Sequence, residues 1–203
     1  MQTYVTLLIP GLNGSSETHW QSVWEREQTG CVRANLGAWR DPTPQLWVER
    51  LEREIARQTL PVVLVAHSLG CIATVMWEQQ SSDALRRKVK GALLVAPCDP
   101  EHCDAVIALR RFTPLPSAPL GFRSIVVASS DDPYATLDRS RAFADNWGST
   151  FVSIGAAGHI NARSNLGAWR YGQALVDALV QEAPQDAGRP PAAPTQGTRA
   201  NLP

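Results

Sequence analysis

A serine at position 68 stands where acyl-transfer chemistry would place its nucleophile. It lies in Ala66-His67-Ser68-Leu69-Gly70, with a small residue two positions before it and another two positions after it. Acyl-transfer enzymes often display their serine in such a frame, on a tight strand-to-helix turn where crowding requires small neighbours. Alanine stands here in place of the usual first glycine. The alternative interpretation is a serine that only caps the following helix.

Two later segments supply the partners that a serine nucleophile requires. A hydroxyl needs an adjacent base, and the base needs a carboxylate that fixes its tautomer. Asp131 and Asp132 follow one late apolar run, and His159 follows the last one. The order of serine, acid and histidine along the chain is that of α/β-hydrolases. The sequence therefore predicts a triad of Ser68, His159 and one aspartate, while the other aspartate caps the next helix.

An acyl-transfer site also needs backbone N–H groups that bind the developing oxyanion. Leu69, directly after the serine, is expected to give one, because a helix N-terminus directs its amides toward the turn. The turn 10–16 is expected to give the other, since its glycines allow the backbone to approach a ligand closely. Leu12 is the first candidate in that turn and Asn13 is the second.

Three residues are candidates for contact with the substrate. Asn13 belongs to the same turn, Trp20 follows it, and Phe112 lies in a long Pro-rich connection over 97–122. Connections of this length often line a site. The competing interpretation places Trp20 in the core and Phe112 in a small apolar cluster that seals the sheet edge, which is the commoner fate of such side chains.

The elements that would position these residues alternate between strands and helices. Apolar runs predict strands over 3–10, 31–36, 61–66, 91–97, 124–130 and 150–154. Amphipathic stretches predict helices over 17–28, 43–58, 69–80, 136–147 and 166–182, with a short one near 102–109. This alternation predicts an α/β fold with a mostly parallel sheet and helices on both faces. The loops that carry the candidate residues then meet at the carboxyl ends of the strands, where open α/β sheets bind ligands.

Composition limits the class of protein and its partners. The 203 residues are 44% hydrophobic, and 19 Lys and Arg balance 19 Asp and Glu, so neither nucleic acid nor an anionic membrane is an expected partner. Residues 1–182 are expected to form one domain, and 183–203, rich in Pro, Ala and Gly, a disordered tail. The four cysteines form no CxxC pair, so we expect free thiols in the cytoplasm and no metal site.

Several motifs taken together resemble a known family. The stretches IPG, HWQSVWE, VAHSLGC, SSDDPY and GHIN resemble the small serine hydrolases that include retinoblastoma-binding protein 9 and bacterial YdeN-like proteins. The resemblance runs from about residue 3 to 180. It implies a compact α/β-hydrolase fold without a large cap domain, tolerance of Ala66, and a triad of Ser68, Asp132 and His159. Asp132 is favoured over Asp131 because it directly precedes a proline.

The function expected on these grounds is hydrolysis of small acyl esters through an acyl-enzyme, with no cofactor. Two alternatives stay open. One is a peptidase or acyltransferase that uses the same triad. The other is a protein-binding module with a vestigial triad, since partner binding is reported for a member of the resembling family.

Overall fold

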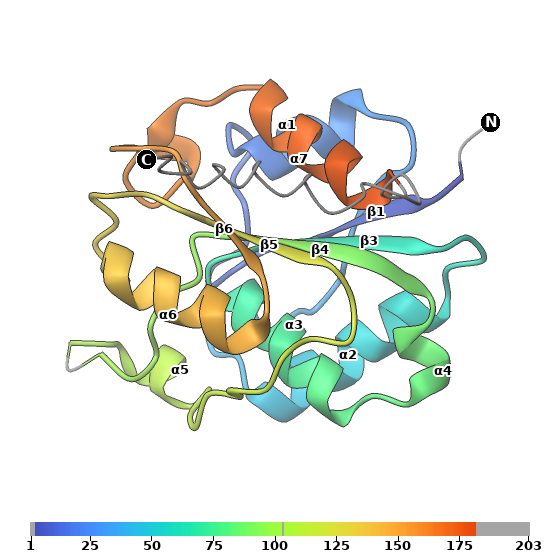
Figure 1. Ribbon diagram of the computed structural model, residues 1–203, viewed down its shortest axis with the longest axis horizontal. Helices are drawn as coiled ribbons and strands as arrows, with labels where there is room; N and C mark the ends of the chain where they lie inside the picture. Colours follow the sequence, from blue (N-terminus) through green and yellow to red (C-terminus); the bar gives the residue numbers. More distant parts are fainter. Residues whose placement is uncertain (1–2, 103, 182–203) are drawn as a thin grey trace, which may run out of the picture.

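The computed structural model describes residues 3–102 and 104–181, which form a single α/β unit (Figure 1). Its centre is a six-stranded sheet in the order β2-β1-β3-β4-β5-β6. Every neighbouring pair of strands is parallel, which confirms the predicted sheet type. The strands are β1 (Val5–Ile9), β2 (Cys31–Arg33), β3 (Val62–His67), β4 (Val89–Val95), β5 (Ser124–Ala128) and β6 (Thr150–Ser153).

Helices cover both faces of this sheet, as predicted. On one face lie α1 (Trp20–Glu27) and α7 (Arg170–Val180) (Figure 1). On the other lie α2 (Pro44–Ala56), α3 (Leu69–Gln80) and α6 (Leu137–Trp147), with the short helices α4 (Asp83–Arg86) and α5 (Ile107–Arg110) beside them (Figure 1). A short 3-10 helix, η1 (Ala162–Ser164), precedes α7. No cap domain is found among the described residues.

The core lies in two layers, one on each side of the sheet. Leu7 and Leu64 pack into the layer under α2, α3 and α6, whereas Leu8 and Val65 pack into the layer under α1 and α7. Successive residues of a strand face opposite sides of the sheet, so a strand covered on both faces must be apolar throughout. β3 is buried at all six of its positions, and it is the strand that leads to Ser68.

The structure differs from the sequence expectation in two short helices. α4 was not predicted, because four residues are too few to show a helical period; Ser82 caps it by accepting from the Leu85 N–H. α5 begins at Ile107 and not near 102. The preceding residues are held instead by side chains, since the Asp99 carboxylate accepts from the Glu101 N–H and pairs with Arg139.

The predicted tail, 183–203, lies outside the described residues. Over the described ranges, none of the helices combines the length and apolar character that crossing a bilayer requires.

Candidate active site

The turn between β3 and α3 holds Ser68 in a strained backbone conformation, with φ 55° and ψ −122°. Non-glycine residues rarely adopt a positive φ, and such strain is typical of a serine displayed on a sharp strand-to-helix turn. Ser68 occupies the N-cap position of α3, but its side chain makes no capping hydrogen bond. The helix-capping alternative for this serine is therefore wrong.

Two glycines allow the turn after β1 to lie against this elbow. A Cβ atom built on Gly70 would lie 2.5 Å from the Ile9 carbonyl oxygen, which no real Cβ tolerates. A Cβ built on Gly11 would lie 2.8 Å from the Ser68 Cβ and 3.3 Å from the Leu69 nitrogen. The turn that follows β1 and the start of α3 are thus in contact only because both positions lack a side chain.

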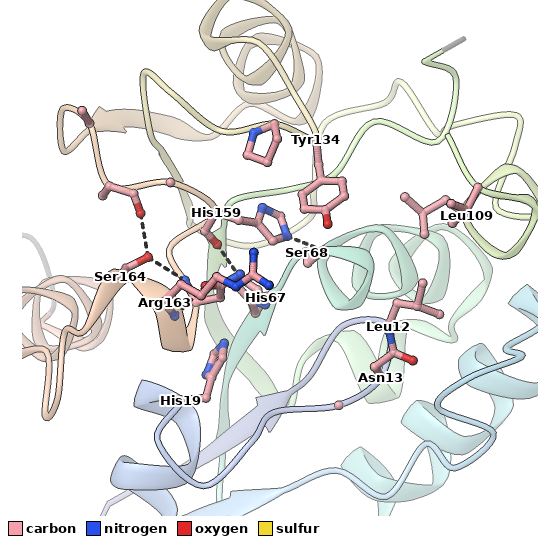
Figure 2. Close-up of a pocket in the computed structure, with 17 residues that line it drawn as sticks. Leu12, Asn13, His19, His67, Ser68, Leu109, Tyr134, His159, Arg163 and Ser164 are labelled. Atoms are coloured by element: carbon pink, nitrogen blue, oxygen red, sulfur yellow. Dashed lines mark hydrogen bonds between the residues drawn. The ribbon is translucent and has the colours of Figure 1, made fainter. Parts of the chain in front are cut away.

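Three side chains from three loops meet at the carboxyl edge of the sheet. The Ser68 hydroxyl lies 2.8 Å from His159 Nε2 (Figure 2). His159 Nδ1 lies 2.8 Å and 2.9 Å from the two carboxylate oxygens of Asp132. Because a carboxylate only accepts, Nδ1 carries the proton and Nε2 is left to accept from the hydroxyl. The side chains of His159 and Asp132 are 8% and 3% exposed, so solvent screens this contact little.

Asp131 has a different position from its neighbour. Its carboxylate accepts from the Ser129 hydroxyl and from the Gly158 N–H, both at 2.7 Å. These hydrogen bonds hold the pKa of Asp131 below its ordinary value and tie it to the loop that carries His159. Neither aspartate caps α6, because the side chain of Thr136 does so; that part of the sequence prediction is wrong.

Trp20 contacts the loop that carries His159 and does not line the cavity. Its indole N–H donates to the Ile160 carbonyl oxygen at 2.8 Å, and the residue is 1% exposed. Its ring packs against Trp24 and Trp169. The prediction that Trp20 contacts substrate is therefore wrong, because α1 turns this face inward against α7.

Two further residues position the site, and sequence reasoning missed the role of the second, Gln21. His67 Nε2 donates to the His159 carbonyl oxygen at 2.9 Å. Gln21 is fully buried, and its side-chain amide donates to the carbonyl oxygens of Ile9, at the end of β1, and of Val65, within β3. The glutamine of the HWQ motif was the only signal that the sequence offered for this role. The role itself could not be predicted, because the partners of Gln21 are backbone atoms of distant segments.

The two histidines near the triad remain neutral at pH 7. Burial, together with the charges of Arg33 and His159, lowers the pKa of His19 to about 4. Burial likewise holds the pKa of His67 well below its ordinary value, with His159 and His19 adding to the effect. His19 Nδ1 accepts from the Gln21 N–H at the start of α1, and its ring packs edge-on against His67.

The amides of Leu12 and Leu69 lie on the two segments that Gly11 and Gly70 bring into contact. The Asn13 N–H is already committed, since it donates to the Trp39 carbonyl oxygen at 2.7 Å. No backbone hydrogen bond in the described turns and loops uses the Leu12 or Leu69 N–H. Of the two candidates in the β1 turn, Leu12 is therefore the one whose amide is free to meet an oxyanion.

Ser68 opens into a cavity of about 840 Å³. The turn after β1, including Leu12 and Asn13, lines it, as do Val106 and Leu109 from the α5 segment; Leu12 and Leu109 lie on the same side of Ser68 (Figure 2). Phe112 does not line it. That ring is fully buried against Trp47 under α2, so the prediction that it contacts substrate is wrong; the long connection reaches the cavity through its residues near α5.

A buried thiol lies beside the serine. Burial raises the pKa of Cys98 to about 12, while a hydrogen bond with Ser68 acts in the opposite direction. A thiol with this pKa is protonated at neutral pH and is a poor nucleophile. The described cysteines Cys31, Cys71 and Cys98 are free and buried, and the described residues contain no group of His, Cys, Asp and Glu arranged to hold a metal ion.

Comparison with known proteins places this chain among hydrolases. The profile of the serine hydrolase family matches residues 6–178. A YdeN-like hydrolase from Pectobacterium atrosepticum is 33% identical, with 88% of this chain and 91% of that chain covered and a TM-score of 0.76. The Bacillus subtilis ydeN product shares the fold at 16% identity, covering 88% and 98% of the two chains with a TM-score of 0.68. Est1E from Butyrivibrio proteoclasticus shares it at 15% identity, 89% and 90% coverage and a TM-score of 0.64. The comparison with curated proteins gives no match.

Proposed function

Because the chain belongs to the serine hydrolase family, we propose that it hydrolyses small acyl esters through an acyl-enzyme formed on Ser68. The observation that carries this proposal is the continuous hydrogen-bonded path from Asp132 through His159 to the Ser68 hydroxyl. A hydroxyl is a weak nucleophile until a base removes its proton, and here the base is already within 2.8 Å of it.

In the first half of the reaction, Ser68 Oγ attacks the ester carbonyl carbon and its proton passes to His159 Nε2. The carbonyl oxygen becomes an oxyanion, which the amides of Leu12 and Leu69 bind. Asp132 stabilises the imidazolium that forms and stays ionised throughout. His159 then gives its proton to the leaving alcohol oxygen as the carbon–oxygen bond breaks, and the acyl group remains on Ser68.

In the second half, a water molecule replaces the alcohol. His159 takes one proton from the water, and the water oxygen attacks the acyl carbon. The second tetrahedral intermediate forms at the same two amides. It collapses to a carboxylic acid as His159 returns the proton to Ser68 Oγ. The enzyme thus regains its starting state, and no step requires a group beyond these side chains, the two amides and water.

The size of the cavity favours small substrates. About 840 Å³ lies within the range of sites that bind drug-sized molecules, and part of it opens to solvent beside Tyr134, which is 51% exposed. We therefore expect esters with short or medium acyl chains. Because Est1E has been solved with ferulic acid bound, a feruloyl ester belongs in the substrate panel.

The experiment has two readouts on the same proteins. A fluorophosphonate probe should label the wild type and Cys98→Ala but not Ser68→Ala. A panel of para-nitrophenyl esters of increasing acyl length should be hydrolysed by the first two and not by the third. Ser153→Ala, which changes an exposed serine in β6, is the matched control and should behave as wild type. Labelling that persists in Ser68→Ala would overturn the proposal.

Peptidase and acyltransferase chemistry would use the same proton path, so acceptor competition must separate them. Product analysis with water, an amine and a thiol present should yield mainly the free acid. A vestigial triad in a binding module is disfavoured because all three side chains remain within hydrogen-bonding distance. Such a module would give neither labelling nor turnover.

A further inference from the structure

The charge of the cavity is uneven. Among the described residues that line it, Arg163 is the only one with a permanent charge, and no aspartate or glutamate is present. His19 and His67 also line it, but burial keeps both neutral at pH 7. The cavity therefore presents one cation to whatever enters.

The guanidinium of Arg163 is not used by the fold. The backbone N–H of Arg163 donates to the Asn161 side chain, which fixes the 3-10 turn η1, but no hydrogen bond or ion pair joins its side chain to another described residue. Arg139, by contrast, is held between Asp99 and Glu101. Figure 2 shows the Arg163 side chain pointing toward the middle of the site, where His67 and Ser68 lie.

The opposite side of Ser68 has a different character. Leu12 and Leu109 lie on that side in Figure 2, and Val106 also lines the cavity from the α5 segment. A substrate carbonyl held at Ser68 would thus have an apolar wall on one side and a cation on the other. Guanidinium groups bind carboxylates and phosphates through paired N–H donors. A neutral ester group has no charged oxygens that accept such a pair of hydrogen bonds.

We propose that Arg163 determines specificity by binding an anionic group on the ester substrate, one separated from the scissile carbonyl by a few bonds. This inference rests on the proposed ester hydrolysis and narrows its substrate class to esters that carry a carboxylate or a similar anion. Because Arg163 is exposed, the contact is partly screened, and the expected preference over a neutral isostere is about fivefold to tenfold in kcat/KM.

The test uses pairs of esters that differ only in charge. For an anion in the acyl half, the para-nitrophenyl ester of glutaric acid is compared with its monomethyl ester. For an anion in the alcohol half, meta-acetoxybenzoate is compared with its methyl ester. The quantity measured is the ratio of kcat/KM for the charged ester to that for the neutral one. At least one pair should give a ratio well above one, and that ratio should fall as salt is raised.

Variants assign the preference to this side chain. Arg163→Gln should bring the ratio close to one, Arg163→Glu should bring it below one, and Arg163→Lys should keep part of it. Arg170→Gln is the matched control, because Arg170 is an exposed arginine a few residues away that does not line the cavity, and its ratio should equal that of wild type. A role confined to folding would change both esters of a pair alike and leave the ratio constant.

The outcomes separate this inference from the function on which it rests. Suppose that the neutral esters are hydrolysed in a Ser68-dependent manner, but that both ratios are near one or do not change in Arg163→Gln. The proposed anion site is then wrong, while the proposed ester hydrolysis is supported. If no ester of either kind is hydrolysed and Ser68 is not labelled, both proposals fall.

Discussion

Asp132 and His159 are joined by a contact of 2.8 Å across 27 positions of sequence, and both carboxylate oxygens of Asp132 take part. One of these oxygens also accepts from the Tyr134 N–H at 2.9 Å. The carboxylate is therefore fixed by its own loop before it meets the imidazole. A fixed acceptor selects the tautomer with its proton on Nδ1, which is the form that can accept a proton from Ser68.

Asp132→Asn should reduce kcat roughly 10³- to 10⁴-fold, because an amide can donate to Nδ1 and so favours the wrong tautomer. Steady-state hydrolysis of a short-chain para-nitrophenyl ester measures this loss. Asp131→Asn is the matched comparison, since it changes the adjacent carboxylate that only ties the histidine loop, and it should cost less than about tenfold. Equal losses in the two variants would contradict the assignment of the acid.

Trp20→Phe should reduce kcat roughly tenfold, because it removes the indole N–H that holds the Ile160 carbonyl beside His159, the proposed base. Trp24→Phe removes an equivalent bond, from another buried indole to the Ala168 carbonyl at 2.7 Å. Trp20→Phe should lower the free energy of unfolding by about 1–3 kcal/mol, since it leaves the Ile160 carbonyl without its donor, whereas Trp24→Phe should cost less, because the Ala168 carbonyl keeps the Gln173 side-chain amide as a donor. Only the first should impair turnover of the folded protein, as judged by kcat corrected for active-site labelling.

Gly70→Ala should destabilise the protein by about 2 kcal/mol or more, measured by urea unfolding. Alanine improves helix propensity by about 1 kcal/mol, but here its Cβ would meet two backbone oxygens that cannot move independently. Gly121→Ala is the control, because the nearest atom there is a side-chain oxygen of Glu78, at 3.1 Å, and not the backbone. If Gly70→Ala were as stable as wild type, the close approach of the β1 turn would not exist in solution.

Acidification should destabilise the fold between pH 6.5 and 4, in part through His19. The pKa of His19 is about 4 in the folded protein and near 6.5 when unfolded, so in this range only the unfolded chain takes up the proton. Stability from this source is complete above pH 6.5 and is lost as the pH falls toward 4, up to about 3 kcal/mol. His67 acts in the same direction.

The variant His19→Asn isolates this contribution, because asparagine can still cap α1 but does not titrate in this range. Its free energy of unfolding should fall less steeply with decreasing pH than that of wild type. Parallel curves for His19→Asn and wild type would show that His19 is not held neutral by burial.

Much of the fold could be predicted from the sequence because its strands are so apolar. A strand such as β3, which is buried at every position, is visible in the sequence as a run of apolar residues with polar residues only at its ends. The order of Ser68, Asp132 and His159 followed from the rule that parallel strands end at one edge. The choice between Asp131 and Asp132 as the partner of His159 was harder to predict. Two adjacent carboxylates differ only in the direction in which the backbone points them.

The aromatic residues show why the rest was not predictable. Trp20 and Phe112 both lie near the site in sequence, yet each is buried by a helix that approaches from elsewhere, α7 in one case and α2 in the other. His67 and Gln21 act on backbone carbonyls of distant segments, and no side-chain pattern encodes such contacts. Burial and hydrogen bonding of this kind depend on the assembled structure.

The long connection between β4 and β5 contributes Val106 and Leu109 to the cavity, but it holds none of the three residues of the proton path. Insertions, deletions or exchanges near α5 would therefore reshape what the pocket admits while the chemistry stays intact. Substitutions in this one segment are thus a route to new substrates during evolution. A protein engineer who wishes to change the substrate range of this protein should randomise that segment first.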